Sequence, residues 1–504
     1  MRKMNQIKAG MILSYMLIIV NALYGFVMTP YIVGCLGEME YGVYKTIGSL
    51  ANSLLILDIG LGSTVMRYVA KYVSNKEEEK IPQFLGMSII QALLLCLVIA
   101  VVSAGVFQTI RPTYSATFTN EQVKKAQLLF AIYCINLLLH VWSGLLTGII
   151  KGHNQFIYAN SMQLLHLILR ASVAFLLLQI HPDSLVLVLS DTCLSLLFMG
   201  MYAAYIKNST KVSFAFSKFN ISLFFESGKY TLVSFLVSLA YQIGGNLDNV
   251  VIGAISGPAM VTVYSMALLI YNMFQNLSMA VSNMLLPTVS KVLADDDESN
   301  SKTIRLIERV GRLQFVILGA ALVGFFCIGK DFLTVWLGKG YEDVYLITLI
   351  LIIPSLFELC VNSCLAILRA KNQLGFFAGT MCAAAVLNAV VTIFSVKYWS
   401  YIGAAVGTSL SVIIGNLIIM NVYFSRKLKL PMLEIYVKIF SRIWLCLALA
   451  GGTLAVVSRF LYGSVVALLA NIAIFCVVYS ISLWYWGLDS AEKREIPVLN
   501  RFVK

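Results

Sequence analysis

The stretch FLGMSIIQALLLCLVIAVVSAGVF, residues 84–107, contains no Asp, Glu, Lys or Arg. As an α-helix it would be about 36 Å long, so it could cross the ~30 Å hydrocarbon layer of a bilayer. The strands of a membrane β-barrel would instead alternate apolar and polar residues over about 10 positions, and the chain lacks that pattern. The stretch therefore predicts a transmembrane helix.

Blocks of the same kind follow one another along the whole chain. Over 504 residues, 59% are hydrophobic, only 12% are charged, and the mean hydropathy is +0.85, whereas a soluble protein carries roughly 25% charged residues. We predict an all-α polytopic membrane protein with about fourteen transmembrane helices. The first block is too long for the apolar region of a signal peptide, so we expect a retained helix. The predicted spans are 9–33, 42–65, 84–107, 126–149, 156–179, 184–206, 229–254, 260–286, 313–336, 344–368, 374–396, 401–424, 436–458 and 463–486.

The segments between these spans differ strongly in positive charge. With the N-terminus inside, the inner segments hold 28 of the 37 Lys and Arg residues and the outer segments hold 8, while Arg170 alone lies in mid-span. Cytoplasmic loops of membrane proteins carry such an excess. The bias therefore predicts that both termini are cytoplasmic. It also explains the net charge of +13 by basic loops facing anionic lipid, without a nucleic acid as partner.

Two short stretches recur at nearly the same offset. Residues 149–156 (IIKGHNQF) return as 367–374 (ILRAKNQL), 218 positions later, in the link between the fourth and fifth helices of a six-helix set. Residues 37–44 and 257–264, offset by 220, each begin with Gly and end with Val-Tyr. We therefore expect two six-helix lobes in parallel orientation, an arrangement that transporters often use, with substrate at the interface between the lobes.

The repeat divides the chain into three predicted parts. Residues 1–210 form the first lobe, residues 211–428 form the second lobe, and residues 429–504 add two further helices and a cytoplasmic tail. No soluble domain interrupts the series of apolar blocks.

Several motifs resemble the polysaccharide-transporter branch of the multidrug/oligosaccharidyl-lipid/polysaccharide flippase superfamily, the O-antigen flippase type. The resemblance covers roughly the first twelve helices. It is carried by YIVGCLGEMEYGVY at 31–44, LDIGLGS at 57–63, DNVVIG at 248–253, Leu286-Pro287, and Trp336-Leu337-Gly338.

This resemblance implies a fold of two lobes that form a V around a central cavity. It also implies that the protein moves an undecaprenyl-diphosphate-linked oligosaccharide outward across a bacterial plasma membrane. The expected partners are this glycan lipid and membrane lipids, with a polysaccharide polymerase and glycosyltransferases as further candidates. No cofactor or metal is expected, because the chain has no phosphate-binding glycine loop, catalytic triad or zinc signature.

Arg170 is the basic residue that no shift of helix boundaries can move into a loop. Charged residues inside a membrane are costly, so they face a cavity, a partner or water. In one interpretation Arg170 belongs to the cationic wall of a cavity for a diphosphate, because guanidinium forms bidentate hydrogen bonds with phosphate oxygens. In the other it forms a buried ion pair with Asp191 on the next helix. Both can hold together.

Three more residues complete the predicted substrate site. His166 lies one turn before Arg170 on the same helix face. Lys45, near the outer end of the second span, would add positive charge if the cavity opens there, but its ammonium can also simply reach the membrane surface. Asn388 is the repeat counterpart of Arg170, so the positive charge would belong to one lobe only.

Four residues are candidates for coupling transport to an ion gradient. His140 and Glu358 are repeat partners at an offset of 218, and both fall near mid-span. Their protonation can be tuned to couple transport to protons, although a polar group between helices can also be purely structural. Asp58 and Asp248 lie in the family-like motifs, where each could bind a cation or accompany a helix bend.

Two other functions are compatible with an all-helical membrane protein. Export of drugs or organic cations uses the same superfamily architecture, but a cationic drug prefers an acidic cavity to one that contains Arg170. A membrane enzyme such as a polysaccharide polymerase or O-acyltransferase usually has large outer loops with clustered Arg or His. The outer loops here are short, so we predict a flippase that is not an enzyme.

Overall fold

The computed structural model describes residues 2–57, 60–210, 246–294, 300–370, 374–489 and 493, and this part of the chain is helical without β-strands. Its contacts divide the chain into two compact units: residues 1–265 with 396–401, and residues 266–395 with 402–504. Among the described residues, nine helices are long and apolar enough to cross a membrane, or ten if one bent pair counts as a single span. The predicted all-α polytopic class is confirmed, whereas the count of fourteen and the three-part division stay predictions.

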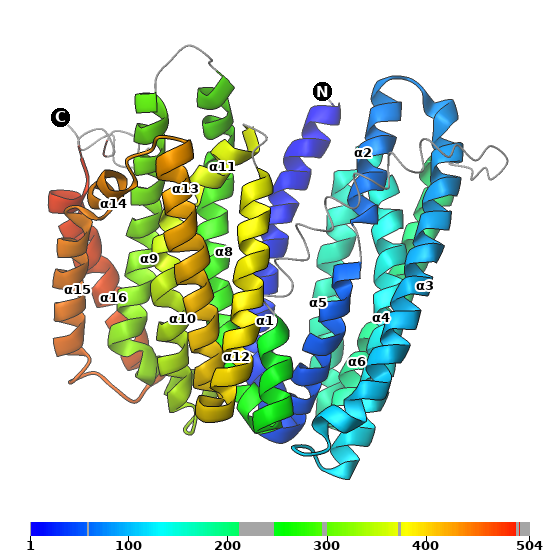
Figure 1. Cartoon of the computed structure of the whole chain (residues 1–504), viewed down its shortest axis with the longest axis horizontal. Coiled ribbons are helices and arrows are strands. Elements are labelled where there is room, and N and C mark those ends of the chain that lie inside the picture. The colour runs from blue at the N-terminus through cyan, green and yellow to red at the C-terminus, as the bar shows by residue number, and fades with distance from the viewer. Residues whose placement is uncertain are drawn as a thin grey trace. The chain divides into compact units, whose positions relative to one another are not determined.

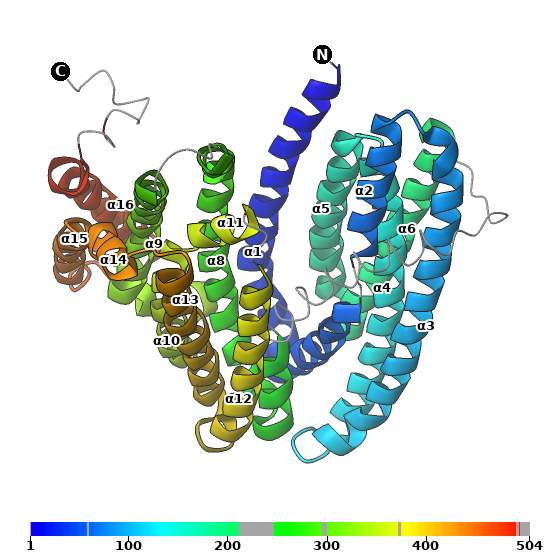
Figure 2. The ribbon, with the colours of Figure 1, turned by 45° about the horizontal axis from the view of Figure 1, so that its top comes forward.

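The first unit is a bundle of helices that lie side by side, as α2 to α6 do in Figures 1 and 2. A further helix over 246–256 and the start of α8 complete it. The elements are α1 (Arg2–Ser53), a 3₁₀ turn (Leu54–Leu57), α2 (Leu61–Ser74), a second 3₁₀ turn (Glu78–Lys80), α3 (Ile81–Tyr114), α4 (Asn120–Gly152), α5 (Phe156–Ile180), α6 (Ser184–Tyr205) and a π-helical turn (Ile206–Thr210).

Glycine residues interrupt these helices at the predicted turn between the first two spans. Gly37 has φ 76° and ψ 165° and divides α1 into two helices. Gly257, its counterpart 220 positions later, has φ 91° and separates helix 246–256 from α8. Residues other than glycine rarely adopt such angles. Both breaks thus fall at the glycines that begin the two similar stretches, and the repeat itself stays a prediction. The predicted span 42–65 is not one helix, because α1 ends at Ser53 and α2 begins after Gly60, which has φ 66°.

A row of glycines lets α2 and α4 pack at backbone distance. A Cβ atom at Gly148 would lie 2.5 Å from the carbonyl oxygen of Gly62, and one at Gly152 would lie 2.7 Å from Cβ of Val69. A Cβ atom at Gly62 would in turn lie 2.6 Å from the carbonyl oxygen of Gly144. Small residues spaced by four allow this approach between membrane helices. The spacing fixes α2 on α4, beside the buried core that these helices share with α3.

The second unit continues α8 and contains several broken spans. In both views α11 lies across the direction of α10 (Figures 1 and 2). The elements are α8 (Pro258–Ala294), α9 (Asn300–Leu337), α10 (Glu342–Cys360), α11 (Ser363–Ala370), α12 (Leu374–Ser411), a π-helical segment (Val412–Ile419), α13 (Met420–Lys427), α14 (Met432–Phe440), α15 (Ile443–Val457), α16 (Val465–Ser482) and a π-helical turn (Leu483–Gly487).

Two predicted spans in this part of the chain are bent or divided, and a further break lies between two predicted spans. The span predicted at 344–368 is divided between α10 and α11. A break at Ser400, with φ 48°, separates the spans predicted at 374–396 and 401–424. The span predicted at 436–458 begins with α14 and bends by 41° into α15. Hydropathy detects the length of an apolar block but not the local backbone angles that bend it.

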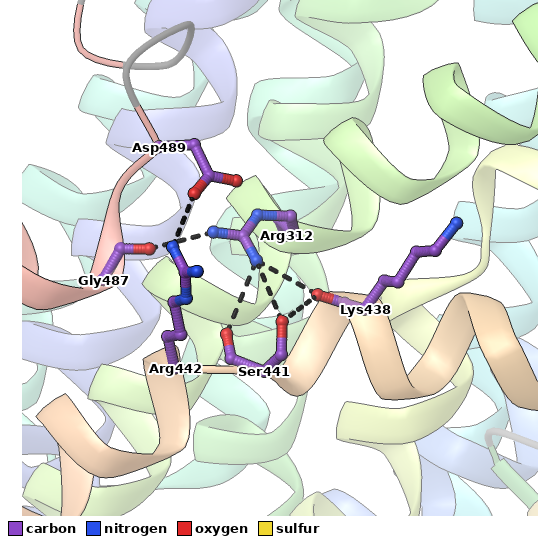
Figure 3. Close-up of polar contacts among 6 residues, drawn as sticks. All are labelled: Arg312, Lys438, Ser441, Arg442, Gly487 and Asp489. Carbon is purple, nitrogen blue, oxygen red and sulfur yellow. Dashed lines mark hydrogen bonds and ion pairs between the residues drawn. The ribbon is translucent and has the colours of Figure 1, made fainter.

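Arg312 holds the last two predicted spans onto α9 within the second unit. One terminal nitrogen donates to the carbonyl oxygens of Lys438 (3.0 Å) and Ser441 (3.4 Å), and the other donates to that of Gly487 (2.9 Å; Figure 3). These acceptors lie where α14 and the π-helical turn end, and the last carbonyls of a helix lack partners within it. Arg312 directly precedes the span predicted at 313–336, which places it in an inner loop, but it is buried and only 9% exposed.

Candidate functional site

Arg170 lies on α5 and forms the ion pair that one of the two interpretations predicted. Its Nε atom is 3.1 Å from Oδ1 of Asp191 on α6. Its Cζ atom is 5.8 Å from the centre of the Tyr24 ring of α1, a cation–π distance. The Arg170 side chain is nevertheless 39% exposed, compared with 21% for Asp191. The pair therefore orients the guanidinium without enclosing it.

The exposed side of Arg170 faces a polar pocket of about 370 Å³ within the first unit. Nε2 of His166 is buried there without a hydrogen-bond partner among the described residues, and the His166 ring lies 4.8 Å from that of Phe198. The ion pair and the pocket are thus both present. The lining residues come from α1 and α5 and are Leu17, Ile18, Asn21, Gln163, His166, Leu167 and Arg170.

The polar side of this pocket follows from helical spacing. Gln163, His166 and Arg170 are separated by three and four positions, so they share one face of α5. Asn21 of α1 lies opposite them in the same pocket. The sequence analysis missed Asn21 and Gln163, although the spacing of Gln163 from Arg170 is a readable signal. The placement of Asn21 depends on how α1 packs on α5, which no local pattern contains.

Lys45 adds a second positive charge near this site. Its Nζ atom is 5.4 Å from the centre of the Tyr41 ring, and Lys45 is not among the residues that line the pocket of Arg170. Arg170 and Lys45 together outweigh the single negative charge of Asp191. The surroundings of Arg170 are therefore suited to an anion held by charge-assisted hydrogen bonds.

The packing of α1 on α5 fixes the pocket wall. The Tyr31 hydroxyl donates to the carbonyl oxygen of Phe175 (3.0 Å), and the two rings lie 4.8 Å apart. At the other end, Nδ2 of Asn160 donates to the carbonyl oxygen of Gly10 and to the hydroxyl of Ser14, both at 2.9 Å. These polar contacts on both sides of the pocket hold Asn21 opposite Arg170.

The ion-coupling candidates occupy different surroundings. Glu358 is half-buried near the end of α10, and its Oε1 atom accepts a hydrogen bond from Nδ2 of Asn416 (2.6 Å). Its repeat partner His140 lies on the exposed surface of α4. Asp248 is 1% exposed and accepts a hydrogen bond from the Tyr264 hydroxyl (2.5 Å). Asp58 lies outside the described residues. The coupling role of all four stays a prediction.

Asn388 lies inside the second unit, between the two halves of α12. It is 2% exposed, and its Oδ1 atom accepts hydrogen bonds from the hydroxyls of Thr392 (3.0 Å) and Thr408 (3.4 Å). This geometry is that of a polar contact between helices. Asn388 is not among the residues that line the pocket of Arg170.

Comparison with known families gives a match over most of the first unit. The model of the family described as polysaccharide biosynthesis protein matches residues 7–294. The chain is 23% identical over 420 residues to the uncharacterized membrane protein EpsK of Bacillus subtilis, with 79% of each chain covered. It is 24% identical over 400 residues to the probable flippase AglR of Haloferax volcanii, with 78% of each chain covered.

Solved structures show the same fold. The lipid II flippase MurJ in an inward closed conformation matches with a TM-score of 0.67 at 16% identity, covering 94% of this chain and 97% of MurJ. An inward-facing multidrug resistance transporter of the MATE family matches with a TM-score of 0.62 at 15% identity, covering 79% of this chain and 92% of the transporter. These similarities establish that the chain has the polytopic all-helical fold of these two proteins.

Proposed function

Because the chain belongs to the polysaccharide biosynthesis protein family, we propose that it flips an undecaprenyl-diphosphate-linked oligosaccharide from the cytoplasmic to the outer leaflet by alternating access. Family and fold together support a membrane flippase of the MOP superfamily. The observation that carries the finer assignment is an arginine that lines a polar pocket although it lies in the middle of an apolar helix.

In this proposal Arg170 holds the diphosphate. Guanidinium presents five donors, and Asp191 cannot accept from all of them. The remaining donors can bind phosphate oxygens, and Lys45 adds long-range attraction. Asp191 keeps the guanidinium in position while the pocket is empty, and His166, Gln163 and Asn21 supply further polar groups at the pocket wall.

The remaining assignments follow from the same proposal. The substrate carries an O-antigen or another surface polysaccharide unit, and the membrane is the bacterial plasma membrane, with both termini in the cytoplasm. A polysaccharide polymerase and glycosyltransferases would act on the same glycan lipid. Glu358, held by Asn416, is the candidate proton or cation site if transport uses an ion gradient.

The test reconstitutes the full chain in liposomes that contain undecaprenyl-diphosphate-N-acetylglucosamine with a fluorescent group on the sugar. Dithionite added outside reduces only outer-leaflet fluorophores, so flipping converts a half-loss of fluorescence into a near-complete loss. We expect Arg170→Ala to reduce the flipping rate at least tenfold while abundance stays near normal. Arg170→Lys should restore part of the rate, because a point charge attracts phosphate without the bidentate geometry.

Arg442→Ala is the matched control, because this arginine is 65% exposed and lies in the other unit; it should leave flipping unchanged. If Arg170 serves only the ion pair, Arg170→Ala will lower abundance, and exchanging the two residues (Arg170→Asp with Asp191→Arg) will restore both abundance and flipping. Restored flipping in the exchanged protein would refute the diphosphate role of Arg170.

Export of organic cations is the alternative that the MATE-like fold favours. The excess positive charge at Arg170 and Lys45 opposes it, because a cation would be repelled there. Ethidium efflux from cells that express the chain distinguishes the two functions. Efflux that competes with flipping of the glycan lipid would favour the exporter.

A further inference from the structure

A half-buried carboxylate lies where a helix of the second unit ends. Glu358 is in the last turn of α10, which stops at Cys360 within the span predicted at 344–368. The C-terminal end of a helix carries a partial negative charge, so a carboxylate there is destabilised unless a positive charge lies near it. The last turn of α10 contains no basic residue. The negative charge of Glu358 therefore has no balancing group on its own helix.

The described residues give this carboxylate one hydrogen-bond partner. Nδ2 of Asn416 donates to Oε1 of Glu358 (2.6 Å). Oδ1 of the same amide is buried and has no hydrogen-bond partner among the described residues. A buried acceptor that lacks a donor is costly. An oxygen of this kind, next to a carboxylate, marks a place where a further group can bind.

An irregular helix positions Asn416. The residue lies in the π-helical segment Val412–Ile419, between α12 and α13, and such segments are rare and frequent at functional sites. In α10, Pro354 has no N–H group, so the carbonyl oxygen of Ile350 lacks its partner within the helix. It accepts a hydrogen bond from the Ser409 hydroxyl instead (2.7 Å). This contact fixes the end of α12 on α10, directly ahead of the π-helical segment.

A second amide oxygen lies beside the same turn of α10. The Tyr436 hydroxyl of α14 donates to the carbonyl oxygen of Phe357 (3.3 Å), which directly precedes Glu358. The same hydroxyl accepts a hydrogen bond from Nδ2 of Asn421 on α13 (3.1 Å). Oδ1 of Asn421 is buried and, within the described ranges, has no hydrogen-bond partner. One carboxylate and two unpaired amide oxygens therefore gather at the end of α10.

This set of groups suits a monovalent cation. Carboxylate and amide oxygens are the ligands of hard cations, and in transporters the C-terminal ends of broken helices coordinate Na⁺. One carboxylate balances one positive charge, whereas a divalent ion would leave an uncompensated charge among apolar helices. A proton on Glu358 could be shared with only one of the two amide oxygens, whereas a cation can contact both.

We propose that Glu358, Asn416 and Asn421 bind a monovalent cation such as Na⁺ at the end of α10. All three residues belong to the second unit. On binding, the Asn416 amide turns so that Oδ1 replaces Nδ2 next to the carboxylate, and the negative end of the helix adds to the attraction. The role of this cation in transport rests on the proposed function, whereas its binding does not depend on the substrate.

Binding of radioactive Na⁺ to the purified full chain in detergent tests the site. We expect saturable binding to the unsubstituted chain. Glu358→Gln keeps the shape of the side chain but removes its charge, so it should lower the affinity at least tenfold. Glu434→Gln is the matched control, because Glu434 is an exposed residue in the first turn of α14 in the same unit; it should leave the affinity within about twofold. No saturable binding, or equal affinity in Glu358→Gln at equal Tm, would overturn the proposal.

Asn416→Asp gives a readout that a purely structural role would not change. It replaces the Nδ2 donor by a second carboxylate oxygen, so two negative charges lie side by side and the site should favour a divalent cation. We expect Ca²⁺ to displace radioactive Na⁺ from Asn416→Asp at a concentration at least tenfold lower than from the unsubstituted chain. Equal displacement in the two proteins, at equal Tm, would contradict the role of Asn416 as a ligand.

Flipping of the fluorescent glycan lipid, assayed in parallel, separates this proposal from the proposed function. Na⁺ binding without flipping would refute the proposed function and leave the cation site standing. Flipping without Na⁺ binding would refute the cation site. If flipping then depends on pH in the unsubstituted chain but not in Glu358→Gln, the residue carries a proton in place of a cation.

Discussion

Replacing Arg312 by methionine should weaken the packing of the last two predicted spans on α9. Methionine has a flexible apolar side chain in place of the aliphatic stem of arginine. It has no hydrogen-bond donor for the carbonyl oxygens of Lys438, Ser441 and Gly487 (Figure 3). These acceptors lie at helix ends, where a positive charge is also favoured by the helix dipole. The Tyr479 hydroxyl, which donates to the carbonyl oxygen of Val316 (2.9 Å), would remain as a polar contact between α16 and α9.

The magnitude follows from the two shorter hydrogen bonds, at 3.0 and 2.9 Å. Each buried acceptor left without a donor costs about 1–3 kcal/mol, so the loss should be about 2–6 kcal/mol. At roughly 2–4 °C per kcal/mol for a body of 150–250 residues, Tm should fall by at least about 4 °C. Arg442→Met is the control, because the Arg442–Asp489 pair is 65% and 54% exposed and such pairs contribute at most about 1 kcal/mol.

The assay is thermal unfolding of the full chain in detergent, followed by the loss of monodisperse protein, together with limited proteolysis. Arg312→Met should expose new cleavage sites near residues 441 and 487, whereas the control should not. A Tm within 2 °C of the unsubstituted chain, or an equal loss in Arg442→Met, would refute the reasoning that Arg312 anchors these helix ends.

Two further predictions concern packing and topology. Gly148→Ala should lower the free energy of unfolding by about 1–3 kcal/mol, because its methyl group would lie 2.5 Å from the Gly62 carbonyl oxygen. Gly144→Ala is the control and should be tolerated, because its methyl group would meet nothing within 4 Å. Equal Tm values for the two variants would contradict the close packing of α2 on α4. Reporter fusions after Lys124 and after Lys302 should report opposite sides of the membrane, outside and inside respectively, and finding both on one side would exclude the fourteen-helix topology.

The sequence by itself determined the class of the protein and several of its local features. A bilayer admits only helices or closed barrels, since each backbone polar group must find a partner within the protein. Long uncharged blocks such as residues 84–107 therefore specify helices without knowledge of their neighbours. A charged side chain inside a membrane must meet water or a polar partner. The position of Arg170 in the middle of a span therefore predicted polar surroundings, and Asp191 on the next helix was the candidate partner. The offset between Gly37 and Gly257 linked two positions at which the structure has helix breaks with positive φ.

Only the tertiary structure decided which residues meet across helices. Nothing in the local pattern around Arg312 separates a loop arginine from one that caps two helix ends, because its partners lie 126 to 175 positions away. Asn21 joins the pocket of Arg170 only because α1 packs on α5. The close contact of Gly42 with the Pro258 carbonyl oxygen likewise depends on how two helices distant in the sequence pack. Hydropathy and spacing show which residues of a helix can face lipid. The contacts described here depend on how helices distant in the sequence pack against one another.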